Sequence, residues 1–62
     1  MGYYLYYGDD WERRTINGRL WLIKNGDGLI ICKQISENGL GIDRTAYAPL
    51  GMSAEELQNY LK

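Results

Sequence analysis

Few side chains in this sequence have the type and spacing that catalysis or metal binding requires. The chain of 62 residues contains no histidine, the residue that most often acts as general acid or base. Its acidic stretch GDDWE holds Asp9, Asp10 and Glu12. Their spacing does not match an EF-hand loop, in which acidic residues alternate with others before a central glycine. We interpret this stretch as a solvated turn, and the sequence predicts neither a metal site nor a cofactor.

The possible nucleophiles all have a structural interpretation. Cys32 lies in the run LIICK, where it is a small apolar strand residue without a histidine beside it to lower the pKa of its thiol. Ser36 lies next to a predicted turn, and Ser53 begins the pattern SAEE that marks the start of a helix. The sequence therefore predicts a protein that is not an enzyme.

Binding of another molecule is the chemistry that the remaining residues favour. Trp, Tyr and Arg are enriched among the residues that contribute most to protein–protein binding. The alternate tyrosines of the segment YYLYY also offer large contact area at low entropic cost. The residues that we expect to contact a partner are Trp21, Arg14, Arg19, Tyr47, Tyr4 and Tyr6.

The elements that must position these residues are short strands and one helix. Asn-Gly pairs between apolar runs are a strong hairpin signal, because both residues accept the positive φ of a type I′ turn. The pairs occur at residues 17–18, 25–26 and 38–39, the second within the possible four-residue loop NGDG. We predict a single α+β domain over residues 1–62, an antiparallel meander of four or five strands with one C-terminal helix packed on one face. The predicted strands cover about 3–7, 11–16, 19–24, 29–35 and 42–48, and the helix about 53–62.

The helix prediction rests on the start of the segment. Ser53 and Glu56 have the spacing of a capping box, in which each side chain bonds the other residue's backbone N–H. Met52 and Leu57 occupy the positions of a hydrophobic staple. At about ten residues the helix is marginal alone and must pack on the sheet.

Hairpin pairing assigns the strand residues to two faces, both of them apolar. The first face carries Trp11, Leu20, Leu22, Leu29, Ile31, Ile35, Ile42, Ala46 and Ala48. The second carries Ile16, Trp21, Ile23, Ile30, Cys32 and Tyr47, mixed with Glu12, Arg14, Arg19 and Gln34. We assign the helix to the first face, whose alanines leave room for it. The second face is then either covered by the N-terminal segment or left for self-association or a partner.

The function that we expect is non-catalytic binding of another protein or of a second copy in a homodimer. Inhibitors encoded by phages and mobile elements, such as anti-CRISPR and host-takeover proteins, have this size and character. The alternative is nucleic-acid binding through a basic and aromatic sheet face. The layout of RLWLIK, LIICKQI, DRTAYAPL and GMSAEEL resembles the arm-binding domains of phage integrases, but those domains are markedly basic and this chain has a net charge of −1. We find no signal peptide or membrane span and expect a cytoplasmic protein.

Overall fold

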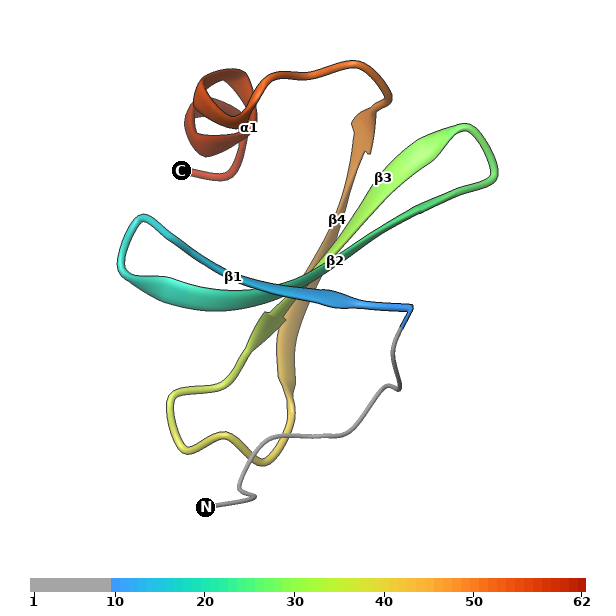
Figure 1. Cartoon of the computed structure of the whole chain (residues 1–62). Coiled ribbons are helices and arrows are strands. Elements are labelled where there is room, and N and C mark those ends of the chain that lie inside the picture. The colour runs from blue at the N-terminus through green and yellow to red at the C-terminus, as the bar shows by residue number, and fades with distance from the viewer. Residues whose placement is uncertain (1–9) are drawn as a thin grey trace.

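The computed structural model describes residues 10–62, which form one antiparallel sheet followed by one helix (Figure 1). The bounds of the elements are Glu12–Ile16 for β1, Arg19–Gly26 for β2, Leu29–Ile35 for β3, Ile42–Pro49 for β4 and Ala54–Tyr60 for α1. The strands lie in the sheet in chain order, β1-β2-β3-β4, and neighbours run antiparallel. The predicted α+β meander with a C-terminal helix is confirmed. The predicted strand at residues 3–7, with Tyr4 and Tyr6, lies outside the described residues.

The first two turns are tight hairpins with positive φ at both loop residues. Asn17 and Gly18 have φ of 53° and 79°, as the type I′ prediction requires. In the segment NGDG the loop residues are Asp27 and Gly28, with φ of 55° and 77°. The predicted turn at Asn25 or across all four residues is therefore wrong: β2 continues through Gly26, because Asp tolerates the left-handed conformation as Asn does.

The third connection differs most from the prediction. A loop over residues 36–41 is closed by hydrogen bonds from Ser36 N to Gly41 O and from Gly39 N to Ser36 O, both 2.9 Å. A bulge at Gln34 and Ile35 shifts the register between β3 and β4 by one residue. Beyond the bulge Ile30 pairs with Ala48, where an unbroken ladder from the Ile35–Ile42 pair would place Tyr47. Since side chains alternate between faces, one extra residue moves the far part of β4 to the opposite face.

The helix covers the second face, which was predicted to be covered by the N-terminal segment or left for self-association or a partner. Leu57 and Leu61 pack in one cluster with the sheet residues Ile16, Trp21, Ile23, Ile30, Cys32 and Ala48, and Ala46 and Met52 pack against this cluster. The prediction that α1 lies on the face of Leu20 and Leu22 is therefore wrong. The bulge is the reason, because it carries the small side chains of Ala46 and Ala48, which leave room for a helix, to the side of Trp21.

The start of α1 has the predicted capping box. Glu56 N donates to Ser53 Oγ at 3.2 Å, and Ser53 N donates to Glu56 Oε1 at 2.8 Å. The helix ends at Tyr60, two residues earlier than predicted. Asn17 Nδ2 donates to Gln58 O at 2.9 Å, which holds α1 next to the turn between β1 and β2 (Figure 1). A short helix thus depends on its cap and on contacts with the sheet.

Candidate partner-binding surface

Trp21 lies in the core between the sheet and α1 and is not on a surface. Only 1% of it is exposed, and it belongs to the cluster that contains Leu57 and Leu61. The guanidinium carbon of Arg44 lies 5.2 Å from the centre of its ring, and Arg44 Nη2 donates to Leu61 O at 2.9 Å. Trp21 was expected to contact a partner from the sheet face without the helix, and this prediction is corrected because α1 covers the face of Trp21.

The two predicted arginines both have partners within the chain. Arg19 Nη2 donates to Asp43 Oδ2 at 2.7 Å and to Ile35 O at 3.1 Å. Arg19 thereby joins β2 to the end of β3 and the start of β4. Arg14 Nη2 lies 3.1 Å from Glu12 Oε1 on the same strand, and both side chains remain more than a third exposed. Arg14 is therefore the more accessible of the two.

Tyr47 is the most exposed of the predicted site residues that lie within residues 10–62. It is 56% exposed, and the bulge turns it to the face away from α1. Four of the five exposed large hydrophobic side chains of the described residues lie on or beside the C-terminal half of β4. Leu29 is paired with Pro49, Leu50 follows the strand, and the hydroxyl of Tyr60 donates to Tyr47 O at 2.8 Å. We call this group the β4 surface; its members are Leu29, Tyr47, Leu50 and Tyr60, between 38% and 56% exposed.

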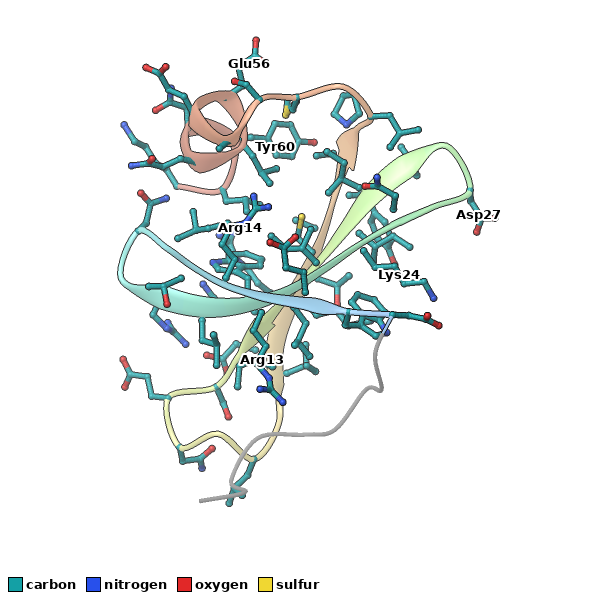
Figure 2. All side chains as sticks on the ribbon, viewed as in Figure 1. Arg13, Arg14, Lys24, Asp27, Glu56 and Tyr60 are labelled. Atoms are coloured by element: carbon teal, nitrogen blue, oxygen red, sulfur yellow. The ribbon has the colours of Figure 1, made fainter. Side chains whose placement is uncertain are left out.

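The sequence did not reveal this surface, because its members come from four different segments. Figure 2 shows Tyr60 on the side of α1 that faces β4. The fifth exposed hydrophobic side chain, Leu40, lies in the 36–41 loop at the other end of β4. By contrast, Leu22 and Ile35 lie on the same sheet face as Tyr47, away from α1, and are only 3% and 2% exposed. Exposure of large apolar groups is thus concentrated at one end of the molecule.

The backbone edge of β4 has few free groups along the β4 surface. The tight turn at Asp27 and Gly28 makes Gly26 and Leu29 a hydrogen-bonded pair, so alternate residues of β3, starting with Ile30, bond to β4. The backbone groups of Tyr47 and Pro49 then point outward. Proline has no N–H, and Tyr47 O already accepts the Tyr60 hydroxyl. Side chains are what this end of β4 offers to a partner.

A pocket of about 220 Å³ lies between α1 and the sheet, next to Leu50. Its lining comes from both strands and helix: Glu12, Arg14, Ile23, Asn25, Ile30, Leu50, Gly51, Met52 and Leu57. Ile23, Ile30 and Leu57 are buried core residues and form an apolar floor. Polar side chains of β1 and β2 stand at its rim, and Figure 2 shows Arg14 on the side of β1 toward α1, with Arg13 on the other side. We call it the α1 pocket.

The thiol of the single cysteine and the hydroxyls of both serines are buried or hydrogen-bonded. Cys32 is fully buried, and burial raises the pKa of its thiol above the ordinary value, more than the positive charge of Arg14 lowers it. The Ser53 hydroxyl accepts the capping bond, and the Ser36 hydroxyl donates to Asn38 Oδ1 at 2.7 Å. Among residues 10–62, no three His, Cys, Asp or Glu side chains are grouped so that they could hold a metal ion.

The positive charges of the central strands gather on the face away from α1. Arg13 and Lys33 both pair with Leu22, and Lys24 is two residues further along β2 on the same face. The ammonium nitrogens of Lys24 and Lys33 lie 5.3 Å and 5.9 Å from the centre of the Trp11 ring. The basic and aromatic group expected around Trp21 is therefore replaced by one around Trp11, on the opposite face.

Comparison with known proteins gives no relative for this chain: no family model, no curated protein and no solved structure matches it. The helix that residues 10–62 contain, α1, lacks the length and apolar character needed to cross a membrane.

Proposed function

We propose that this protein is a small non-catalytic module that binds another protein through the β4 surface. The observation that carries the proposal is the position of the exposed large hydrophobic side chains in residues 10–62, four of the five lying on or beside the C-terminal half of β4. Exposed apolar groups gathered in one place are typical of interaction sites. Two of the four are tyrosines, a residue type enriched among the main contributors to binding. The buried thiol of Cys32 and the capping role of Ser53 add support, since neither is placed to attack a substrate.

The mode of contact follows from the edge of β4. Because Pro49 has no N–H and Tyr47 O is bonded to Tyr60, a partner that lengthens the sheet would leave its own backbone groups unpaired there. We therefore propose contact through side chains, with Tyr47 and Leu50 as the main anchors. The partner is a foreign protein, as for an inhibitor encoded by a phage or mobile element, or a second copy in a homodimer. A cytoplasmic location suits the single cysteine, which has no partner in the chain for a disulfide.

The test compares Tyr47→Asp with the matched control Leu40→Asp, because both place a carboxylate at an exposed apolar position. Light scattering over a range of concentration measures self-association, and capture from a lysate of cells that carry the sequence measures binding to other proteins. We expect the wild type and Leu40→Asp to form the complex and Tyr47→Asp to lose it. A monomer that captures the same proteins with both variants would contradict the proposal.

A second candidate function, nucleic-acid binding, is favoured by the basic outer face of Arg13, Lys24 and Lys33. Cations on neighbouring strands suit a phosphate backbone, and aromatic rings beside them stack on bases. Both lysines lie over the Trp11 ring, however, and so compete with a base for it. Titration of a labelled single-stranded oligonucleotide at several salt concentrations separates the two functions. Affinity that falls steeply with salt and is lost in Lys33→Glu would favour this candidate.

A further inference from the structure

We infer that α1 separates from the sheet as one unit while the four strands stay folded, and that this opening exposes the apolar face around Trp21. The change involves contacts within the chain alone, so it is independent of the proposed partner and of the β4 surface. Regions that bury few apolar side chains open more readily than the whole domain unfolds. The contacts of α1 with the sheet are of this kind.

The apolar contact between α1 and the sheet comes from few side chains. Leu57 is the buried residue of α1 itself, Leu61 follows the helix, and Met52 before it is half-buried. The other residues of α1 are exposed. The α1 pocket lies between α1 and the strands β1 and β2, so the two layers are not in full contact on that side. A helix of seven residues is unstable alone, so α1 loses its structure when it leaves the sheet.

Three side-chain hydrogen bonds in residues 10–62 also hold α1 and the residue after it on the sheet. Asn17 Nδ2 donates to Gln58 O at 2.9 Å, Arg44 Nη2 donates to Leu61 O at 2.9 Å, and the Tyr60 hydroxyl donates to Tyr47 O at 2.8 Å. The first and the third are exposed, and the second is only partly buried. Because water replaces an exposed hydrogen bond when it breaks, each of them adds little to the free energy that holds α1 in place.

The sheet keeps its own contacts when α1 leaves. Antiparallel ladders join all neighbouring strands, and α1 takes no part in them. The face away from α1 has buried side chains of its own, Leu22 and Ile35. Opening of α1 therefore removes one apolar layer and leaves the other, so it requires less free energy than unfolding of the whole chain.

Cys32 reports the opening, because it lies beneath α1. Its side chain is fully buried in the cluster that contains Leu57 and Leu61, so iodoacetamide reaches the thiol after α1 has left or after the whole chain has unfolded. Labelling over a range of urea concentration separates the two routes, since the urea dependence scales with the surface that is exposed. At low urea we expect labelling at least about tenfold faster than global unfolding allows, with a weak urea dependence. The chain unfolded in high urea gives the intrinsic rate of the thiol.

Hydrogen exchange identifies the element that moves. Leu57 N donates to Ser53 O and Leu61 N donates to Leu57 O, so both amides lose their bonds when α1 opens. We expect them to exchange with the same opening free energy as the labelling of Cys32. The amides of Lys24 and Ile31, which are paired in the ladder between β2 and β3, should exchange more slowly.

Asn17→Asp and Asp27→Asn are the matched variants, because each keeps a residue that accepts the positive φ of its turn. Asn17→Asp replaces the amide donor by a carboxylate beside Gln58 O, near the negative C-terminal end of α1. It should speed the labelling of Cys32 about fivefold or more. Asp27→Asn lies in the turn between β2 and β3, away from α1, and should change the rate by less than about twofold.

Fast labelling with a weak urea dependence, faster still in Asn17→Asp, would support the opening of α1. Labelling that follows the urea dependence of global unfolding at every concentration would overturn it, because α1 and the strands would then open together. Equal labelling rates in Asn17→Asp and Asp27→Asn would overturn it as well, since the reagent would then reach Cys32 without release of α1. Exchange at Leu57 as slow as at Ile31 would also contradict it. None of these outcomes alters the test of the β4 surface.

Discussion

Substitution of Trp21 by alanine gives the sharpest test of which sheet face α1 covers. Trp21 is 1% exposed and packs in the cluster that contains Leu57 and Leu61. Its ring also lies 5.2 Å from the guanidinium carbon of Arg44. The substitution therefore removes the largest side chain of the core and leaves a cavity between sheet and helix.

The expected loss of stability is large relative to the total. Truncation of a buried Trp to Ala typically lowers the free energy of unfolding by about 3–5 kcal/mol. At about 0.05–0.15 kcal/mol per residue, a chain of this length has a total of roughly 3–9 kcal/mol. With a urea dependence of about 1 kcal/mol/M, the unfolding midpoint should fall by about 3 M or more. Trp21→Phe keeps an aromatic ring and removes less volume, so we expect about 1–2 kcal/mol.

Urea unfolding followed by circular dichroism measures these changes. Tyr47→Ala is the control, because that side chain is mostly exposed and its removal should lower the unfolding free energy by less than about 1 kcal/mol. If α1 instead covered the face of Leu20 and Leu22, Trp21 would lie on the uncovered face and Trp21→Ala would cost no more than Tyr47→Ala. A loss below about 1 kcal/mol in Trp21→Ala, equal to that in Tyr47→Ala, would refute the assignment of Trp21 to the core.

Three further predictions concern the helix cap at Ser53, the buried thiol of Cys32 and the side-chain bonds of Arg19. Ser53→Ala should lower the unfolding free energy by about 1 kcal/mol through loss of the cap, whereas Glu56→Gln, which keeps a capping-box side chain, should lower it less in the same urea assay. Since burial raises the pKa of Cys32 above its ordinary value of 9.0, the thiol should contribute fully to stability below pH 9.0. That contribution should decline as the pH rises above 9.0, because the thiol ionises more readily in the unfolded chain than in the folded one. If the unfolding free energy has the same pH dependence in the wild type and in Cys32→Ala, this prediction is wrong. Arg19→Ala removes bonds to Ile35 O and to a half-exposed carboxylate, so it should cost less than about 1 kcal/mol but speed hydrogen exchange of the amides in the 36–41 loop.

The elements set by short-range chemistry could be predicted from the sequence. Asn17–Gly18 forms the expected turn because both residues accept positive φ. Ser53 and Glu56 form the expected capping box because each bonds a backbone N–H that the helix itself leaves unpaired. These features depend on a few neighbouring residues, and no distant contact is needed to specify them.

The faces of β4 could not be predicted, because they depend on a single bulge. Nothing in the residue types around Gln34 and Ile35 indicates that Asp43, which lies opposite them on β4, has no partner in the ladder. The inference that the alanines lie beneath the helix was correct in its physical reason: Ala46 and Ala48 do lie on the side of α1. It assigned them to the wrong face because the pairing was extended without interruption from the turn.

The candidate site was predicted only in part for the same reason. Tyr47 was correctly expected to be exposed, but it was assigned to the same face as Trp21, which α1 covers. The bulge places Tyr47 on the opposite face, the face of Leu29. Trp21 and Tyr47 have similar residue chemistry, and the register alone decides that the first packs in the core and the second faces solvent. Leu50 belongs to the β4 surface because it lies in the loop between β4 and α1, and Tyr60 belongs to it because its hydroxyl bonds Tyr47 O. No local sequence pattern predicts either position.

The hydrogen bond from Tyr60 to Tyr47 O also bears on how the protein behaves at high concentration. A sheet that ends in an open strand is a template on which further copies stack without limit, and apolar segments such as LIIC favour growth of fibrils. Here the C-terminal end of β4 is closed to such growth by a phenolic hydroxyl that occupies its acceptor and by Pro49, which lacks a donor. In other proteins, edge strands are commonly protected by a lysine side chain or by a loop that covers the edge. In this chain Tyr60 of the terminal helix and Pro49 block the same end of β4, so the helix limits strand addition there as well as contributing Leu57 and Leu61 to the core.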